Sequence, residues 1–171
     1  VAQALLNDYP EVQEATRICP GGAPQVTYNE KTFQENSFAY ADASLFSVFT
    51  LPLLAGDPAT ALAAPNTMVI TKAIAQKYFG NENPIGKILS FKSWNTAYKI
   101  TGVIDKVPEN SHFHFDMFAA MSSLPDAASN SWMTSNYYTY LVLPEGYDYK
   151  KLEAKLPKTV EKYMGPQIQQ A

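Results

Sequence analysis

The sequence of 171 residues has very little cysteine, histidine or arginine, and each shortage excludes a class of function. Its single cysteine, Cys19, excludes an internal disulfide and any metal site built from several thiolates. Arg17 is the only arginine, and the net charge of −3 is mildly acidic. Nucleic-acid phosphates require clustered positive charge, so we expect no nucleic acid among the partners.

Long apolar runs are also missing. The most apolar stretch, residues 43–56, is interrupted by serine, threonine and proline and falls short of the about 20 residues that a membrane helix needs. The first residues lack the charged start and apolar run of a signal peptide. Because the sequence opens at Val1 rather than at a methionine, we expect a piece of a longer protein, with any membrane anchor outside it.

What the sequence does contain is apolar and aromatic. Hydrophobic residues make up 46% of it, aromatic residues 13% and charged residues only 17%. This composition is far too apolar for a disordered chain and predicts a packed core. The length suits one domain, or one domain that carries an insertion.

The hydrophobic pattern predicts a mixture of helices and strands. Strands are expected at 12–18, 25–28, 37–41, 67–71, 87–91, 98–104 and 137–143, with 113–121 extended. Helices are expected at 1–8, 43–49, 72–79 and after Asp148. Helix–strand–strand at the start and strand–helix at the end resemble a split βαβ unit with an insertion, so the expected class is α+β.

Several local signals sharpen these expectations. Asp42 is expected to cap the helix at 43–49, and Thr71 and Gly80 to begin and end the helix between them. Segment 137–143 has apolar residues on both faces, which places it centrally in a sheet. Pro157 predicts a kink or two short helices after Asp148. The apolar stripe of that last helical segment is expected to comprise Leu152, Leu156, Val160 and Tyr163 or Met164.

One short segment has the residue types of a metal site. In an extended chain His112, His114 and Asp116 would share a face, and two imidazoles with a carboxylate can hold zinc or iron. Both histidines of the sequence lie here, so no third imidazole can complete the site. The alternative is a strand that turns Phe113 and Phe115 into the core and leaves the polar side chains in water. This alternative is favoured.

Other catalytic templates find no support. No Gly-x-Ser-x-Gly elbow and no phosphate-binding Gly-x-x-x-x-Gly-Lys motif occurs, and Cys19 is interpreted as a small apolar residue rather than a nucleophile. A basic helical face is interpreted as solvated surface rather than as a docking face. Its residues are Lys150, Lys151, Lys155, Lys158 and Lys162.

Several segments together resemble one family, the extracytoplasmic (MacB-like periplasmic core) domain of MacB/FtsX-type ABC transporter permeases, in its Bacteroidetes form. The matching segments follow one another in order over nearly the whole chain. They are Tyr9-Pro10-Glu11-Val12, Ala15-Thr16-Arg17, Tyr40-Ala41-Asp42, Leu45-Phe46-Ser47-Val48-Phe49, the run from Leu53 to Leu62, Val69-Ile70-Thr71, Ala75-Gln76-Lys77-Tyr78-Phe79-Gly80, Asn83-Pro84-Ile85-Gly86-Lys87, Val103-Ile104, Val107-Pro108-Glu109-Asn110-Ser111-His112-Phe113 and Tyr138-Thr139-Tyr140-Leu141.

The resemblance implies a Porter-like split βαβ lobe with an inserted, mixed α+β Sabre-like lobe. Residues 1–42 and 135–171 would form the Porter-like lobe and residues 43–134 the inserted one. It also implies a segment that lies between two transmembrane helices, on the periplasmic side of the cytoplasmic membrane. The implied partners are a cytoplasmic ATP-binding subunit, a second permease copy and a periplasmic adaptor protein. No cofactor and no catalytic residue is carried over.

Three functions follow in order of preference. The first is a non-enzymatic periplasmic domain that couples ATP hydrolysis to efflux or other extracytoplasmic work by mechanotransmission. The second is a sensor domain that binds a ligand or peptide between the two lobes. The third, remote alternative is a metal-dependent hydrolase that uses His112, His114 and Asp116.

Overall fold

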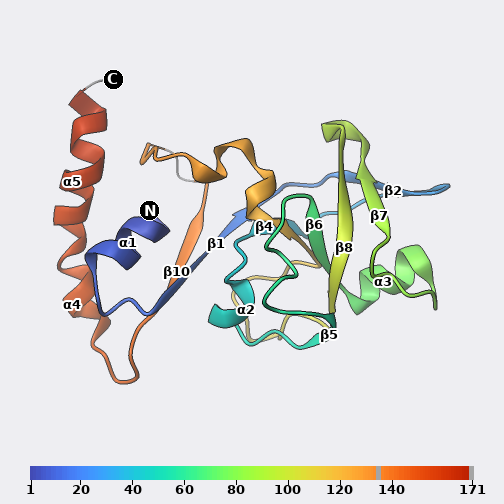
Figure 1. Cartoon of the computed structure of the whole chain (residues 1–171), viewed down its shortest axis with the longest axis horizontal. Helices are drawn as coiled ribbons and strands as arrows, with labels where there is room; N and C mark the ends of the chain where they lie inside the picture. Colours follow the sequence, from blue (N-terminus) through green and yellow to red (C-terminus); the bar gives the residue numbers. More distant parts are fainter. Residues whose placement is uncertain (134–135, 170–171) are drawn as a thin grey trace.

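The computed structural model describes residues 1–133 and 136–169, which form ten strands and five α-helices (Figure 1). The strands are β1 (Glu14–Pro20), β2 (Gln25–Tyr28), β3 (Lys31–Gln34), β4 (Phe38–Ala41), β5 (Leu53–Gly56), β6 (Thr67–Thr71), β7 (Ile88–Phe91), β8 (Thr96–Ile104), β9 (Met117–Ala120) and β10 (Tyr138–Val142). The α-helices are α1 (Ala2–Asp8), α2 (Leu45–Val48), α3 (Lys72–Phe79), α4 (Tyr149–Glu153) and α5 (Leu156–Gln169). Short 3₁₀ turns occupy Lys92–Trp94, Met121–Ser123 and Pro125–Ala128.

All ten strands belong to one sheet in the order β10-β1-β4-β9-β6-β8-β7-β2-β3, with β5 paired to β8. The pairs β4–β9 and β6–β8 are parallel and the others are antiparallel. The expected α+β class is confirmed. The helices α1, α4 and α5 gather beside the β10 end of the sheet, whereas the β2–β3 hairpin projects from the other end (Figure 1).

The sheet separates two apolar cores. Because side chains alternate along a strand, Phe38 and Tyr40 of β4 enter one core while Ala39 and Ala41 enter the other. The first core packs under α3 and its largest buried side chains include Tyr78, Tyr98, Phe38, Phe91 and Ile100. The second core includes Ile18, Leu45, Leu62, Ile104, Phe113 and Phe118. Each large apolar side chain buried in this way contributes about 1.5–3 kcal/mol to folding.

Several local predictions are confirmed. Strands β2 and β6 have the predicted bounds, and α3 begins and ends as expected. The Thr71 side chain accepts a hydrogen bond from Ile74 N, and Gly80 follows the helix with a φ of +61°, which glycine adopts without strain. Pro157 lies in the first turn of α5, just after the break from α4. Of the two expected outcomes, a kink or two short helices, the division into two helices is found, although α5 with 14 residues is not short.

The central placement of segment 137–143 is wrong. The strand found there, β10, lies at the end of the sheet and pairs only with β1 among the described strands. Tyr138 is 61% exposed. An apolar pattern on both faces shows that a strand is covered above and below, and both faces of β10 are partly covered. The pattern does not show whether a strand has hydrogen-bonded neighbours on both of its edges. The central placement of the strand was therefore not determined by the sequence.

Other boundaries also differ from the predictions. Strands β3 and β5 were not predicted, and segment 113–121 forms a strand only over β9. Helix α2 is shorter than expected and follows Ser44, because the carboxylate of Asp42 is bound to Arg17 instead of capping the helix. The stripe predicted for the last helix is also wrong in part, since Thr159 is buried and Val160 is 45% exposed.

The two-lobe division stays a prediction. One boundary, between residues 134 and 135, lies outside the described residues. The sheet runs through both expected lobes, since β4 of the first range pairs in parallel with β9 of the second. No helix in residues 1–133 or 136–169 is long and apolar enough to cross a membrane.

Candidate functional site

The three candidate metal ligands do not converge. His112 Nε2 lies 2.8 Å from the Tyr140 hydroxyl, and the His114 side chain is exposed. Asp116 Oδ1 accepts a hydrogen bond from the hydroxyl of Thr71 at 3.3 Å, just before β9. Segment 112–116 belongs to no strand; β9 begins at Met117. Within the described ranges no three His, Cys, Asp or Glu residues are grouped so that they could hold a metal ion.

His112 belongs instead to an aromatic cluster that joins β10 to the second core. The rings of Phe49 and Tyr140 meet edge to face at 5.0 Å, and those of Phe49 and Phe113 at 5.1 Å. The His112 ring lies 5.1 Å from that of Tyr140. Burial raises the pKa of the Tyr140 hydroxyl, which stays protonated at neutral pH. These contacts pack the loop that contains His112 and Phe113 against strand β10.

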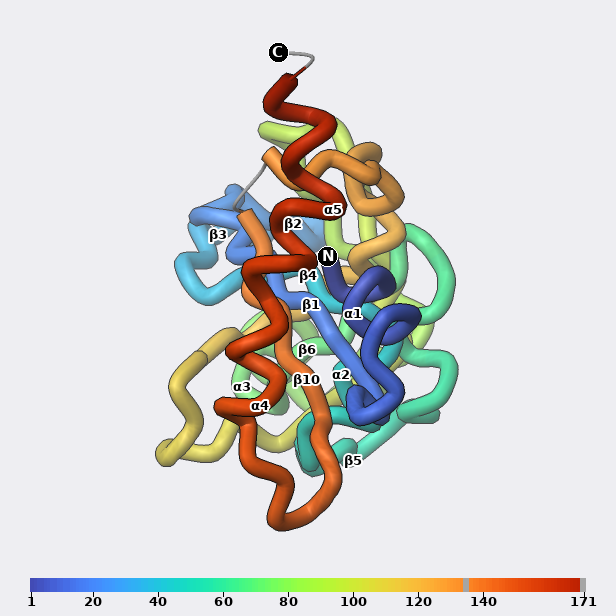
Figure 2. Tube along the Cα trace, turned by 90° about the vertical axis from the view of Figure 1, so that its left-hand side faces the viewer, coloured from blue at the N-terminus to red at the C-terminus, as the bar shows by residue number. Residues whose placement is uncertain are grey.

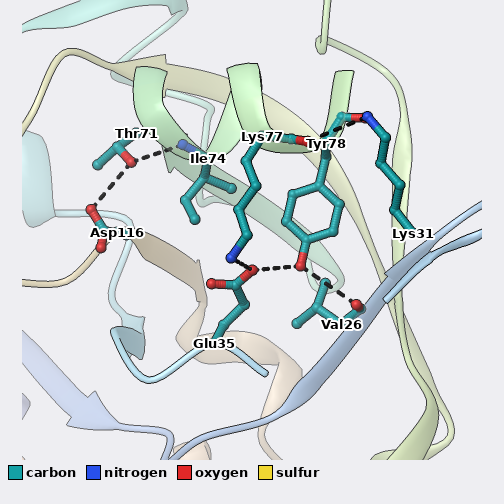
Figure 3. A network of polar contacts seen from close by, with 8 residues as sticks. All are labelled: Val26, Lys31, Glu35, Thr71, Ile74, Lys77, Tyr78 and Asp116. Carbon is teal, nitrogen blue, oxygen red and sulfur yellow. Dashed lines mark hydrogen bonds and ion pairs between the residues drawn. The ribbon is translucent and has the colours of Figure 1, made fainter. Parts of the chain in front are cut away.

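A buried carboxylate is the centre of a second polar group (Figure 3). Glu35, which follows the β2–β3 hairpin, is only 7% exposed. Its Oε1 accepts hydrogen bonds from Lys77 Nζ at 2.8 Å and from the Tyr78 hydroxyl at 2.5 Å, both on α3. The Tyr78 hydroxyl also lies 3.4 Å from Val26 O of β2. The carboxylate thus ties the hairpin to one side of the helix.

The same hairpin holds the carboxyl end of α3. Lys31 Nζ donates to Tyr78 O at 2.8 Å and to Lys77 O at 3.3 Å, two carbonyls of the last helical turn (Figure 3). Burial, and then the bond to Glu35, raise the pKa of the Tyr78 hydroxyl. The phenol therefore remains a donor to the carboxylate, and Lys77 supplies the neutralising charge.

We name Glu35, Lys77, Tyr78 and Lys31 the α3 clamp. A glutamate, a lysine and a tyrosine in contact are also found in reactive sites. Here, however, Tyr78 is only 1% exposed and its hydroxyl is hydrogen-bonded to Glu35. A group that must exchange protons with a substrate needs access to it. Sequence reasoning missed this cluster because its members are 42 and 43 residues apart, and no motif connects them.

A second ion pair joins β1 to Asp42, the residue that follows β4. Arg17 and Asp42 form a bidentate pair, with Nε–Oδ2 and Nη2–Oδ1 both at 2.8 Å. Arg17 Nη1 also donates to Ala127 O at 2.9 Å, and the Arg17 backbone N–H donates to Asp42 Oδ2 at 2.8 Å. The bonds to Asp42 raise the pKa of the Arg17 guanidinium. The single arginine therefore fastens three segments of the chain.

Two adjoining cavities lie beside this pair. The first has a volume of about 400 Å³ and the second about 560 Å³, and Val1, Arg17 and Ser129 line both. The first is lined further by Asp126, Ser131, Asn136, Tyr137 and Thr139. Its hydroxyl and amide groups can bind polar atoms, but the charge of Arg17 is already neutralised by Asp42. Both cavities combine residues from the two expected lobes.

Comparison with known proteins identifies a family. The family model of the MacB-like periplasmic core domain matches residues 1–159. A crystal structure of a domain of a candidate permease from Porphyromonas gingivalis is 26% identical, with a TM-score of 0.83. The match covers 95% of this chain and 76% of that chain. The Porphyromonas source agrees with the expected Bacteroidetes form.

Two more distant structures share the fold. The periplasmic region of MacB from Actinobacillus actinomycetemcomitans is 16% identical with a TM-score of 0.69, over 96% of this chain and 72% of that one. The extracellular domain of the noncanonic ABC-type transporter YknZ from Gram-positive bacteria is 16% identical with a TM-score of 0.61. That match covers 85% of this chain and 73% of the other.

No curated protein sequence matches the chain. The family match nevertheless spans nearly all of it, and the first structural neighbour reproduces the fold over the same length. The resemblance inferred from the motifs is therefore confirmed. The family is one of transporter permease domains rather than a known enzyme family, and an ATP-binding subunit is the partner that such transporters imply. The chain belongs to the MacB-like periplasmic core domains of ABC transporter permeases.

Proposed function

We propose that this domain transmits mechanical force and has no catalytic role of its own. In the full permease it lies between two transmembrane helices, and ATP hydrolysis by the cytoplasmic subunit moves it as a rigid body. A second permease copy and a periplasmic adaptor protein are the partners on which the movement acts. The product of the cycle is efflux or other work outside the membrane.

One observation carries this proposal, which is the continuity of the sheet. A single ten-stranded sheet spans the described part of the chain, and the α3 clamp and the Arg17–Asp42 pair fasten its flanking segments. A body that transmits displacement must resist internal deformation, and close-packed cores with cross-linked elements do so. The candidate catalytic residues of the sequence do not converge, which also supports a mechanical role.

The test measures distances during the ATP cycle. Spin labels replace Lys99 on β8 and Lys158 on α5, two exposed positions at distant parts of the domain, in a permease without other cysteines. ATP is expected to change the distance between Lys99 labels of the two copies. The distance between Lys99 and Lys158 labels within one copy is expected to stay unchanged. A change within the copy, or no change between copies, contradicts rigid-body transmission.

A second function, a ligand- or peptide-binding sensor, is favoured by the cavities beside Arg17. They contain hydroxyl and amide groups suited to a polar ligand, and they lie between the two expected lobes. Binding of labelled peptides to the full permease, lost on Tyr137→Ala, would support this function. The metal-dependent hydrolase has no comparable support, because its three ligands diverge.

A further inference from the structure

The β2–β3 hairpin leaves one edge of the sheet open. Strand β3 pairs with β2 on one side, and within residues 1–133 and 136–169 its other side has no strand partner. The hairpin projects from the end of the sheet that is remote from α1, α4 and α5 (Figure 1). All four residues of β3 are exposed. An edge of this kind presents unpaired N–H and C=O groups that can bind a further strand.

This edge has none of the usual protection against pairing. The register of β3 with β2 is regular, without a bulge, and β3 contains no proline. Its single charged residue, Lys31, is turned toward α3, where Nζ donates to Tyr78 O at 2.8 Å and to Lys77 O at 3.3 Å (Figure 3). A lysine protects an edge by placing its charge over it. Lys31 does not do so, and β3 is free to pair.

The register of the hairpin shows which backbone groups point outward. A two-residue turn, residues 29–30, joins the strands, and the pair next to such a turn exchanges both hydrogen bonds. Hydrogen-bonded pairs then alternate along the hairpin, and in agreement with this order Glu35 N donates to Pro24 O at 2.9 Å. It follows that Thr32 and Gln34 direct their N–H and C=O groups away from β2.

We infer that, in the nucleotide-free permease, β3 of one copy pairs antiparallel with β3 of the second copy. This inference rests on the proposed function, because it names the contact surface of the second copy invoked there. Contacts between two identical chains are two-fold, and an edge that pairs with itself about a two-fold axis is antiparallel. With the axis at Phe33, Thr32 lies opposite Gln34 of the second copy, and every outward N–H and C=O of these residues is bonded. An axis at Thr32 or Gln34 would leave the other residue opposite the turn or beyond the strand.

The side chains agree with this register. The two Phe33 residues form a non-hydrogen-bonded pair, in which Cα atoms are about 4.5 Å apart and the side chains pack closely. The Phe33 side chain is 38% exposed, and its ring meets Tyr78 edge to face at 5.4 Å. The next pair on the same face sets Lys31 against Glu35 of the second copy, so opposite charges face one another. The edge is therefore complementary to itself.

The contact is small, and the permease supplies what it lacks. Pairing of two four-residue strands is expected to bury less than the about 1,200 Å² of a stable complex, so the isolated chain is expected to stay monomeric in dilute solution. Two copies anchored in one permease are held at a much higher effective concentration. Pairing there would join the two sheets into one and couple the movements of the copies.

The test is oxidative cross-linking in the full permease, without nucleotide and in a background without Cys19 or other cysteines. Phe33→Cys places its thiol next to the same thiol of the second copy. Thr32→Cys is the matched control, because it is also exposed on β3 but its Cα would lie more than about 7 Å from that of the second Thr32. Phe33→Cys is expected to form the intermolecular disulfide at least about tenfold faster than Thr32→Cys.

Two further variants test the backbone hydrogen bonds. Thr32→Pro removes an outward N–H that β2 does not use, whereas Thr32→Val keeps this N–H. Both variants lose the hydroxyl that contacts Thr27, so they differ mainly in the backbone. In the Phe33→Cys background Thr32→Pro is expected to slow cross-linking about tenfold or more, because each copy loses a hydrogen bond to the other. Thr32→Val is expected to leave the rate nearly unchanged.

Amide exchange provides a readout that needs no substitution. In the dilute 171-residue chain Thr32 and Gln34 are expected to exchange fast and Phe33 slowly, because only Phe33 directs its N–H to β2. In the permease Thr32 and Gln34 are expected to exchange at least about tenfold more slowly, while Phe33 changes little. Slow exchange of residue 33 also shows that the hairpin stays folded in the proline variant.

Three outcomes overturn the inference. Equal cross-linking of the two cysteines indicates random collision, and unchanged cross-linking with Thr32→Pro shows that no backbone pairing exists. Slow exchange of Thr32 and Gln34 without Phe33→Cys cross-linking assigns the edge to a different protein. Cross-linking in a permease whose domains do not move with ATP would support this inference and contradict the proposed function. Movement with ATP in a permease that does not cross-link would contradict this inference alone.

Discussion

The α3 clamp makes a quantitative prediction about stability. Glu35→Ala removes the carboxylate that Lys77 and Tyr78 share. Tyr78 is buried, so its hydroxyl keeps only the weak contact with Val26 O at 3.4 Å, at a cost of about 1–3 kcal/mol. The Lys77 side chain is 35% exposed and can turn to water, so the lost ion pair adds no more than about 1 kcal/mol. We expect the free energy of unfolding to fall by about 1–4 kcal/mol.

Urea unfolding of the 171-residue chain, followed by tryptophan fluorescence, measures this change. Glu35→Gln retains an acceptor for the Tyr78 hydroxyl and is expected to lose about half as much. Glu82→Ala is the matched control, because it also removes a glutamate paired with a lysine, Lys87, but at an exposed position. It is expected to change the free energy by less than about 1 kcal/mol.

A double-mutant cycle isolates the buried contact. Tyr78→Phe removes the hydroxyl, so Glu35→Ala should be less harmful in that background, with a coupling energy of about 1 kcal/mol or more. If Glu35→Ala were no more destabilising than Glu82→Ala, the argument that this carboxylate fastens α3 to the hairpin would be refuted.

Three further predictions concern the sheet and helix α5. The buried hydroxyl of Thr16 has no hydrogen-bond partner among the described residues, so Thr16→Val is expected to raise the free energy of unfolding by about 1 kcal/mol in urea titrations. Gly56 has a φ of +96°, and a Cβ there would lie 2.3 Å from Thr101 O, so Gly56→Ala is expected to lower the thermal midpoint and to disrupt the β5–β8 pairing seen by amide exchange. Lys155 and Lys162 hold the pKa values of Glu11 and Asp8 below their usual range. Their contribution is present above about pH 4 and is lost as the pH falls through the lowered values. Acid is therefore expected to release α5 first. The fluorescence of Trp132, which stacks on Tyr163, should change before global unfolding in a Trp94→Phe background, and equal midpoints would contradict this order.

What could be predicted from the sequence is what depends on neighbours in the chain. Thr71 and Gly80 delimit α3 because capping and the left-handed conformation involve residues within one helical turn. Pro157 divides α4 from α5 for the same reason. The family resemblance also consists of such turns, caps and strand starts. It therefore identified the scaffold correctly.

The polar clusters depend on residues that are distant in the chain, and the sequence does not show which of them meet. Asp42 has every local property of a helix cap, yet its carboxylate pairs with Arg17, 25 residues away, and α2 begins without it. Glu35 follows an exposed hairpin strand and carries no sign of burial. Its environment is created by α3 packing over the sheet, which no periodicity encodes. The same limit applies to His112, whose contact with Tyr140 spans 28 residues.

The apolar stripe predicted for α5 shows a further limit of periodicity. Leu156, Val160 and Met164 are four residues apart, which predicts one covered face. The described residues instead cover the side that carries Thr159 and the pair of Lys162 with Asp8, and Val160 is 45% exposed. Helix α5 stands at the β10 end of the sheet (Figure 2). The pattern therefore placed the covered face one position away from the residue that the fold buries, Val160 instead of Thr159.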